Sequence, residues 1–257
     1  MEALRGLGVV VEVLGWDEAF LAVETDDPEA FAEDVRTAVL DATRLHCSVG
    51  IGDNKLQAKI ATGFGKPQGV GRLTSEDWFA VMGDRPTDAL WGVGRKTAAK
   101  LAELGIHTVS ELASTEAQLL ADRLGPTMGP WYRRLGRGVD SSPVDPTPYV
   151  ARGHGRETTF QENQTDWAVV ADAVRELAGQ VTADIGAEGR PAVRVGMKLR
   201  YAPFETRSRS LTLPGPTSEV ADVTAAALEL LTRFDQSRAV RLVGVRAEMA
   251  PPASGGG

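Results

Sequence analysis

The sequence predicts an α+β protein made of three successive segments, and three observations support this prediction. Near the N-terminus, apolar β-branched runs flank a glycine, which is typical of a β-hairpin that helices then follow. Between residues 74 and 140, short helical patterns alternate with glycines. Residues 150–250 read as strand, helix, strand, strand, helix, strand. We therefore expect segments at 1–73, 74–140 and 150–250, with a linker at 141–149 and a disordered tail at 251–257.

The first segment opens with two predicted strands, at residues 9–14 and 19–23. Asp17 and Glu18 lie in the turn between them, and Gly15 gives that turn the freedom to bring both carboxylates to one side. Acids between apolar strands are costly unless cations offset them, and Mg²⁺ prefers oxygen ligands. We interpret the pair as part of a two-metal site, with a plain polar turn as the alternative.

A helix, a strand and a second helix should follow the hairpin. Asp27 is a predicted N-cap and Pro28 a first-turn residue of the first helix. Residues 45–51 read as a buried strand, and residues 55–64 as a helix that Asp53 or Asn54 caps. The residues expected on the core faces of these two helices are Phe31, Val35, Val39, Leu56, Ile60 and Phe64.

Three lysines follow the carboxylate pair in the chain. Lys55 and Lys59 are four residues apart and share one helix face. Lys66 lies in a turn that Gly65 and Pro67 restrict, next to the sheet that bears the acids. We expect Lys59 to bind the phosphates of a nucleic acid and Lys66 those of a nucleotide. A solvated helix face is the alternative.

The second segment contains a glycine-rich turn between two short helices, the first starting near Pro86. Residues 90–94 have the pattern apolar-x-Gly-apolar-Gly, and Arg95 and Lys96 begin the next helix. Glycines at these places let backbone N–H groups approach a phosphate, and the helix dipole adds attraction. The predicted phosphate contacts of this helix-hairpin-helix are Gly92, Gly94, Arg95 and Lys96, and the alternative is a tight interhelical turn. Gly105 should end that helix, and Thr108 with Glu111 should form a capping box.

A cationic strand distinguishes the third segment. Apolar residues alternate with Arg194, Lys198 and Arg200, so this strand should be half-buried with a charged outer face. The next strand should place hydroxyls on one face and guanidiniums on the other, and both groups donate to phosphate oxygens. Its candidate residues are Thr206, Arg207, Ser208, Arg209 and Ser210. We expect a phosphate-binding sheet, and an edge strand kept soluble by its charges is the alternative.

Composition and charge agree with a globular, nucleic-acid-binding protein only after they are divided along the chain. The 257 residues are 42% hydrophobic, and the formal net charge of −7 argues weakly against a polyanionic partner. Residues 1–47, however, hold eleven acids against three arginines, whereas residues 190–210 hold six bases against Glu205 alone. Cys47 cannot form an internal disulfide, and neither a leader nor a membrane-spanning run is visible. We therefore expect a cytoplasmic protein without a membrane partner.

Taken in order, these blocks resemble the Y-family of translesion DNA polymerases, of the DNA polymerase IV type. The resemblance covers nearly the whole chain, and its order is more specific than any single block. The matching stretches are residues 15–21, 47–55, 58–69, 91–94, 104–106 and 241–245.

The resemblance implies a role for each segment. Residues 1–73 would be part of a palm, residues 74–140 a thumb, and residues 150–250 a little finger. Asp17 would bind Mg²⁺, Glu18 would be the second catalytic acid and metal ligand, and Lys66 would hold the incoming triphosphate. The implied substrates are primer-template DNA and a deoxynucleoside triphosphate, and the implied state is a monomer.

Three departures from the family pattern shape the expected function. A first palm strand with its metal-binding acid, and a fingers region, should precede Met1, so we expect an N-terminally truncated chain. Gly15 and Trp16 replace a more usual Ser-Ile before the acids, and no clamp-binding peptide follows Met249. We expect an error-prone lesion-bypass DNA polymerase, inactive as this chain alone but able to bind DNA. A non-catalytic DNA-binding accessory protein is the alternative, whereas a helix-hairpin-helix glycosylase lacks its acid at Gly125-Pro126-Thr127.

Overall fold

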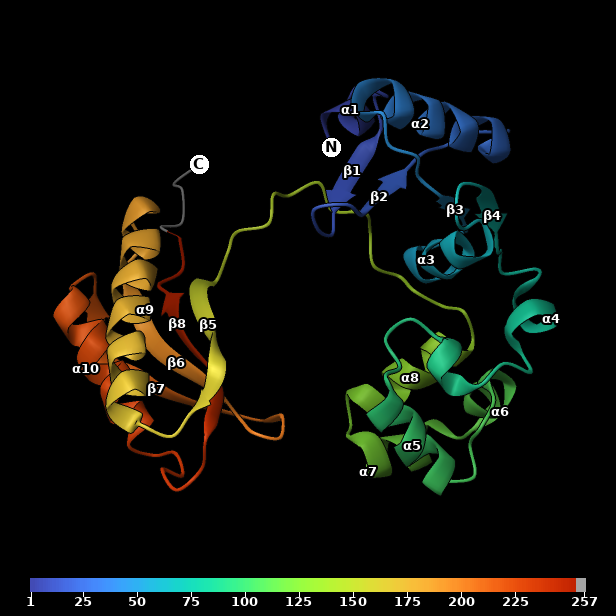
Figure 1. The fold of residues 1–257 in the computed structure, drawn as a ribbon. Coiled ribbons are helices and arrows are strands. Elements are labelled where there is room, and N and C mark those ends of the chain that lie inside the picture. The colour runs from blue at the N-terminus through green and yellow to red at the C-terminus, as the bar shows by residue number, and fades with distance from the viewer. Residues whose placement is uncertain (253–257) are drawn as a thin grey trace. The chain divides into compact units, whose positions relative to one another are not determined.

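The computed structural model describes residues 1–252 and divides into two compact units, an N-terminal unit Met1–Pro148 and a C-terminal unit from Tyr149 onward (Figure 1). The predicted linker at 141–149 contains neither helix nor strand. Of the predicted tail, residues 253–257 lie outside the described part. Within residues 1–252, no helix has both the length and the apolar character needed to cross a membrane.

The N-terminal unit opens with a short helix and the predicted hairpin. Helix α1 (Glu2–Arg5) precedes strands β1 (Val10–Val13) and β2 (Ala19–Ala22), which pair antiparallel. Helix α2 (Pro28–Thr43) starts as predicted, because the Asp27 carboxylate accepts a hydrogen bond of 2.9 Å from the Ala30 N–H. Its predicted core face is partly wrong. Ala32 and Val35 are buried, whereas Phe31 and Val39 are only half-buried.

A strand, a helix and a second strand follow. Strand β3 (Val49–Ile51) pairs parallel with β4 (Val70–Arg72), and α3 (Lys55–Phe64) connects them. The register places Gly50 opposite Gly71, and a Cβ atom on either would lie 2.0–2.1 Å from a backbone oxygen of α3. Only glycine therefore allows α3 to lie so close to the strands. The strand predicted at 45–51 is shorter than expected, β4 was not predicted, and Phe64 is exposed rather than inward-facing.

Six short helical elements complete the N-terminal unit. Their bounds are α4 (Trp78–Met82), η1 (Thr87–Ala89), α5 (Arg95–Glu103), α6 (Val109–Ser114), α7 (Ala117–Leu124) and α8 (Met128–Gly136). The capping box of Thr108 and Glu111 is confirmed, and Gly105 follows α5 with a φ of +76°. The helix predicted near Pro86 is a single 3₁₀ turn. One hydrophobic core joins Leu56 and Leu73 to Leu101 and Leu112, so it continues across the predicted boundary at residue 73.

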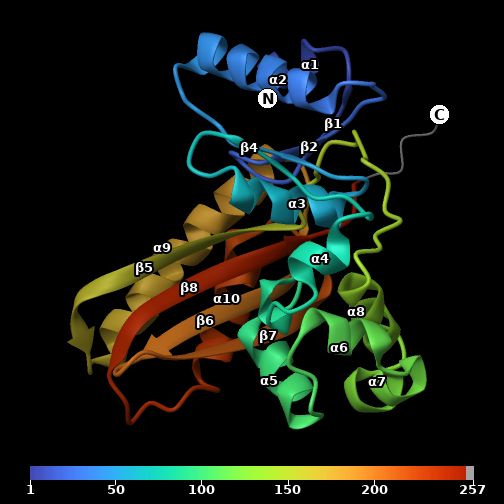
Figure 2. The ribbon, with the colours of Figure 1, turned by 90° about the vertical axis from the view of Figure 1, so that its right-hand side faces the viewer.

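The C-terminal unit has the predicted order of strand, helix, strand, strand, helix, strand. Its elements are β5 (Gly153–Gln164), α9 (Trp167–Ala187), β6 (Ala192–Tyr201), β7 (Glu205–Thr217), α10 (Val220–Leu231) and β8 (Val240–Met249). The sheet order is β5-β8-β6-β7, and every pair is antiparallel. Both helices pack on one face of the sheet, as Figure 2 shows with α9 and α10 behind the strands. The α+β class is therefore confirmed.

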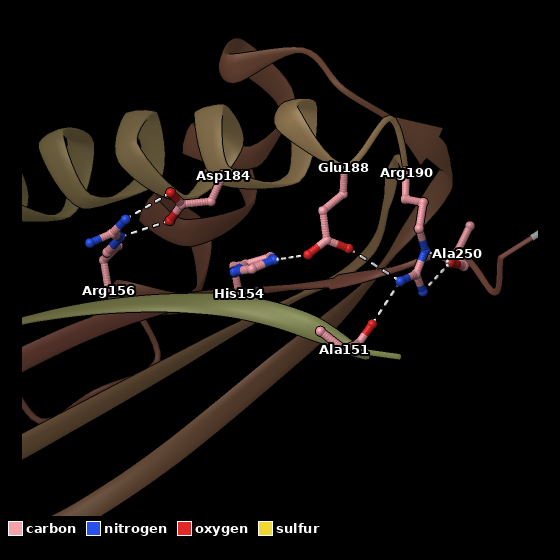
Figure 3. Close-up of polar contacts among 7 residues, drawn as sticks. All are labelled: Ala151, His154, Arg156, Asp184, Glu188, Arg190 and Ala250. Carbon is pink, nitrogen blue, oxygen red and sulfur yellow. Dashed lines mark hydrogen bonds and ion pairs between the residues drawn. The ribbon is translucent and has the colours of Figure 1, made fainter. Parts of the chain in front are cut away.

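Charged side chains hold the ends of this sheet to α9 (Figure 3). The Arg190 guanidinium donates hydrogen bonds of 2.7 Å to the carbonyl oxygens of both Ala151 and Ala250. Arg156 on β5 forms two hydrogen bonds, of 2.7 and 2.8 Å, with the Asp184 carboxylate on α9. Because Ala151 precedes β5 and Ala250 follows β8, Arg190 joins the segment before β5 to the segment after β8.

Candidate active-site acids and nucleic-acid interface

The hairpin turn presents its two acids to solvent in different settings. Glu18 lies 2.5 Å, Oε1 to Nζ, from Lys59 on α3, and half of its side chain stays exposed. The hydrogen bond from Lys59, then the charges of Lys59 and Lys66, hold the pKa of Glu18 below its usual value. Asp17 is exposed and takes part in none of the ion pairs formed within residues 1–252.

These two acids do not fit a two-metal centre by themselves. Such a centre needs several carboxylates in one small site. Over the described range, 1–252, no group of three or more His, Cys, Asp and Glu side chains is placed to hold a metal ion. Moreover, an oxygen of Glu18 already accepts the Lys59 ammonium group. The structure therefore brings Asp17 and Glu18 together as neighbours on a turn without adding a third acid.

The lysines of α3 have partners within the unit. Lys55 donates hydrogen bonds of 2.8 and 3.1 Å to Glu12 on β1, and its ammonium lies 5.5 Å from the centre of the Phe20 ring. Glu12 also accepts the N–H of Asp145 at 2.8 Å, so it ties β1 to the segment after α8. The shared helix face of Lys55 and Lys59 thus faces the hairpin acids. A phosphate would have to compete with Glu18 for Lys59, whereas Lys66 is exposed.

The glycine-rich turn before α5 presents backbone N–H groups at the start of that helix. Gly92 has a φ of +98°, and an added Cβ would lie 2.8 Å from the Trp131 ring. Gly94 is the N-cap of α5, and nothing lies within 4 Å of its would-be Cβ. Its carbonyl accepts the N–H groups of the third and fourth helical residues at 2.9 and 3.0 Å, which leaves those of Arg95 and Lys96 without an intrahelical acceptor. Both residues are exposed.

The C-terminal unit carries its basic residues on the sheet face opposite α9 and α10. Arg194, Lys198 and Arg200 alternate along β6 with residues buried under the helices. Register places Thr206, Ser208 and Ser210 of the neighbouring β7 on the same face. They lie opposite Arg200, Lys198 and Gly196, respectively.

Several of these cations are already paired on the open face. Arg194 donates to the Ser210 hydroxyl at 2.6 Å and lies 3.9 Å from Glu248, and Lys198 forms an ion pair with Glu157. Gly196 and Gly244 have no side chain at the centre of the face, where a hollow of about 750 Å³ opens. The backbone of the strands is therefore open between the cations.

Arg207 and Arg209 lie on the other side of the edge strand. They are opposite Leu199 and Met197, whose side chains face the helices. Arg207 forms an ion pair of 2.5 Å with Glu205, and the Arg209 guanidinium lies 5.9 Å from the centre of the Phe234 ring. The structure therefore separates these two arginines from the neighbouring hydroxyls of Thr206, Ser208 and Ser210, as the alternation predicted, and from the cations of β6.

The sequence reasoning missed Arg246 on β8. This side chain is exposed, lies opposite Gly196 and Gly155 on the open face, and belongs to none of the ion pairs within residues 1–252. The signal was present in the sequence, because Arg246 stands between the buried Val245 and Ala247 in an alternating strand.

Comparison with known proteins identifies the family that shares this arrangement. Residues 1–63 match the family model described as the impB/mucB/samB family, and residues 151–255 match the C-terminal domain of that family. Residues 88–140 match the DNA polymerase-iota thumb domain. A Y-family DNA polymerase chimera of known structure has the same fold, with a TM-score of 0.82 at 22% identity over 96% of this chain and 74% of that one.

Proteins with similar sequences indicate which group of the family the chain belongs to. A DNA polymerase IV 2 of Mycobacterium tuberculosis is 44% identical over 250 residues, which are 96% of this chain and 72% of the relative. The DNA polymerase IV of Methanoculleus marisnigri is 35% identical, over 93% of this chain and 67% of the relative. The chain belongs to the Y-family of DNA polymerases, which are nucleotidyltransferases, and within it to the DNA polymerase IV group.

Proposed function

We propose that this chain is part of a lesion-bypass DNA polymerase and that its basic surfaces bind primer-template DNA. The observation that carries the proposal is the open face of the C-terminal sheet, where cations, hydroxyls and a glycine-floored hollow occur together. Hydroxyl and guanidinium groups donate to phosphates without reading bases, so binding should follow the DNA backbone. Family membership supports the same conclusion.

In this proposal each part of the chain has one task. Residues 1–73 act as part of the palm, residues 74–140 as a thumb whose turn at Gly92 and Gly94 holds the DNA backbone, and residues 150–250 as a little finger. Lys66, exposed beside the acids, would contact the phosphates of the incoming deoxynucleoside triphosphate. Asp17 and Glu18 would supply two of the acids that Mg²⁺ requires. Because these two acids do not make a two-metal centre by themselves, we attribute no reaction step to metal in this chain.

DNA binding is tested by fluorescence anisotropy of a labelled primer-template at several salt concentrations. We expect affinity that falls steeply as salt rises and that depends little on sequence, because released counterions drive phosphate binding. The variant in which Arg194 and Lys198 are both changed to Ala should bind DNA more weakly and show a smaller salt dependence. Unchanged affinity between low and high salt, or no binding at low salt, would contradict the proposal.

A second function is a non-catalytic DNA-binding accessory protein, which the Glu18–Lys59 ion pair favours because it occupies a candidate metal ligand. Primer extension with Mg²⁺ and deoxynucleoside triphosphates tests whether this chain alone holds a complete active site. We expect no measurable extension by the chain alone, because two acids do not complete a two-metal site. Extension that Asp17→Ala abolishes would instead show a complete active site and would exclude the accessory role.

A further inference from the structure

A cavity of about 450 Å³ lies within the N-terminal unit. Its lining comes from α3, the glycine-rich turn before α5, helix α8 and the segment that follows α8. Leu56 and Leu135 are buried and form the apolar part of the lining. Pockets that hold small organic ligands have volumes of about 300–1,000 Å³. Asp17, Glu18 and Lys66 do not line the cavity, so it is separate from the proposed reaction centre.

Two indoles line this cavity and are supported from outside it. The Trp91 ring meets Phe20 edge-on at a centroid distance of 5.9 Å, and the Trp131 ring meets Tyr132 edge-on at 5.0 Å. Within residues 1–252 the two indoles do not pair with each other. Trp91 is 42% exposed and Trp131 is half-buried. Each ring is therefore held by a neighbouring ring, while part of its surface stays available to a ligand.

The lining also carries one cation and one anion. Arg134 on α8 is exposed and belongs to none of the ion pairs formed within residues 1–252, whereas its neighbour Arg137 donates to the Ala113 carbonyl at 3.0 Å. One oxygen of Asp140 accepts the N–H of Ser142 at 2.9 Å and the hydroxyl of the same residue at 2.7 Å. These bonds fix the carboxylate and leave its second oxygen for a donor on a ligand.

The combination indicates a ligand that is flat and aromatic, carries hydrogen-bond donors and ends in an anion. A purely apolar ligand would use neither charge, and an inorganic anion would use neither ring. A purine nucleotide uses all of these groups, because aromatic side chains bind the face of a base and a guanidinium binds phosphate.

We propose that the cavity binds a free purine nucleotide. Its base lies against Trp91 and Trp131, its phosphate meets Arg134, and an amino or hydroxyl group donates to Asp140. A nucleotide within a DNA duplex would first have to leave the base stack, which costs free energy, so the free nucleotide is the favoured occupant. This site is additional to the proposed function and does not rest on DNA binding.

The test is isothermal titration calorimetry of the full chain with adenosine 5′-monophosphate (AMP) and with adenosine. EDTA is present, so that no Mg²⁺ supports binding at the proposed reaction centre. Wild-type protein should bind AMP more tightly than adenosine. Arg134→Ala should bind AMP about tenfold more weakly and adenosine unchanged, because only AMP carries the phosphate. Trp91→Ala should weaken binding of both ligands about tenfold, and Trp91→Phe should recover part of the loss.

Three further variants keep the test independent of folding and of other sites. Arg123→Ala is the matched control for Arg134→Ala, because Arg123 is an exposed arginine on α7 of the same unit and does not line the cavity. It should bind AMP like the wild type. Lys66→Ala removes the lysine proposed for the incoming nucleotide and should also leave AMP affinity unchanged. Asp140→Asn keeps an oxygen for Ser142 but removes the charge, so it should weaken binding of both AMP and adenosine while Tm stays unchanged.

Four outcomes would overturn the proposal. They are no AMP binding at millimolar concentration, equal AMP affinity of wild type and Arg134→Ala, inorganic phosphate that binds as tightly as AMP, and AMP binding that Lys66→Ala abolishes. In the last case the nucleotide would lie at the reaction centre. If AMP fails to bind while Trp91→Ala lowers affinity for a duplex with one unpaired purine, the occupant is DNA and the proposal is also wrong. None of these results bears on the salt dependence of primer-template binding, which tests the proposed function separately.

Discussion

The Lys59 ammonium group lies 2.5 Å from a carboxylate oxygen of Glu18, and this contact joins α3 to the turn that carries the candidate catalytic acids. Lys55, one helical turn earlier, makes the corresponding contact with Glu12 on β1. Helix α3 is thus held to the hairpin by two ion pairs on one face. Because each acid already pairs with an ammonium group, a metal ion would have to compete with that group to bind the acid.

Removing Lys59 should change the titration of Glu18. The hydrogen bond and charge of Lys59 favour the ionised carboxyl, so Lys59→Ala should raise the pKa of Glu18 toward its usual value. Carbon-13 NMR of the labelled side-chain carboxyl, recorded against pH, measures the change. Lys55→Ala removes the neighbouring ammonium that pairs with Glu12 and serves as the control. A pKa of Glu18 that stays lowered without Lys59 would show that another group holds it down.

The two glycines of the turn before α5 should respond differently to alanine. Gly92→Ala places a Cβ at positive φ and 2.8 Å from the Trp131 ring, so we expect it to destabilise the protein by about 1–3 kcal/mol. The Cβ that Gly94→Ala adds would have no atom within 4 Å, so this variant should fold normally. If a phosphate approaches the N–H groups there, Gly94→Ala should weaken DNA binding without lowering Tm. Thermal unfolding and anisotropy titrations distinguish the two outcomes, and a stable Gly94→Ala with unchanged affinity would remove the turn from the interface.

Arg246 should contribute to DNA binding although it lies outside the basic run of β6. It is exposed on the open face opposite Gly196. Arg246→Ala should reduce the slope of log affinity against log salt by about 0.9, the value for one lost phosphate contact. Arg156→Ala is the control, since Arg156 points to the helix side and pairs with Asp184. Equal slopes for wild type and Arg246→Ala would place this side chain away from DNA.

The ion pair between Arg156 and Asp184 should make stability depend on acid pH. The hydrogen bond from Arg156 lowers the pKa of the Asp184 carboxyl against the opposing effect of burial. A carboxyl with a lowered folded-state pKa stabilises the protein above its unfolded value, near 3.8, and loses this contribution as pH falls through the lower folded value.

Urea unfolding of Asp184→Asn and wild type, followed by circular dichroism, tests this expectation. The variant should unfold at lower urea near neutral pH, and the difference should shrink below pH 3.8. Asp172→Asn removes a more exposed carboxylate of the same helix, paired with Arg175 over one turn, and should change stability much less. A difference between Asp184→Asn and wild type that is constant with pH would indicate a packing effect instead.

Local signals predicted the fold well where they act over a few residues. The Asp27 cap, the Thr108–Glu111 capping box and the alternation along β6 all appear in the structure. The predictions were wrong where contacts with an element distant in the sequence determine the local structure. Strand β4 has only three residues and exists because it pairs with β3 across α3, and no local pattern reports that pairing. Phe64 has helical spacing for the core, yet it is exposed, with the Arg85 guanidinium 4.9 Å from the centre of its ring.

The sequence by itself determined the class of fold, the order of the elements, the family resemblance and the residue types available for metal and phosphate. These features depend on caps, periodicity and motif order, which act along the chain. Only the tertiary structure determined which charged side chains pair with one another. Glu18 meets Lys59 across 41 residues, while the alternation of β7 and the register with β6 place Arg207 and Arg209 on the helix side and Ser208 on the open face. Such contacts form between elements that are far apart in sequence, so packing and register, rather than local propensity, determine which cations are paired and which stay exposed.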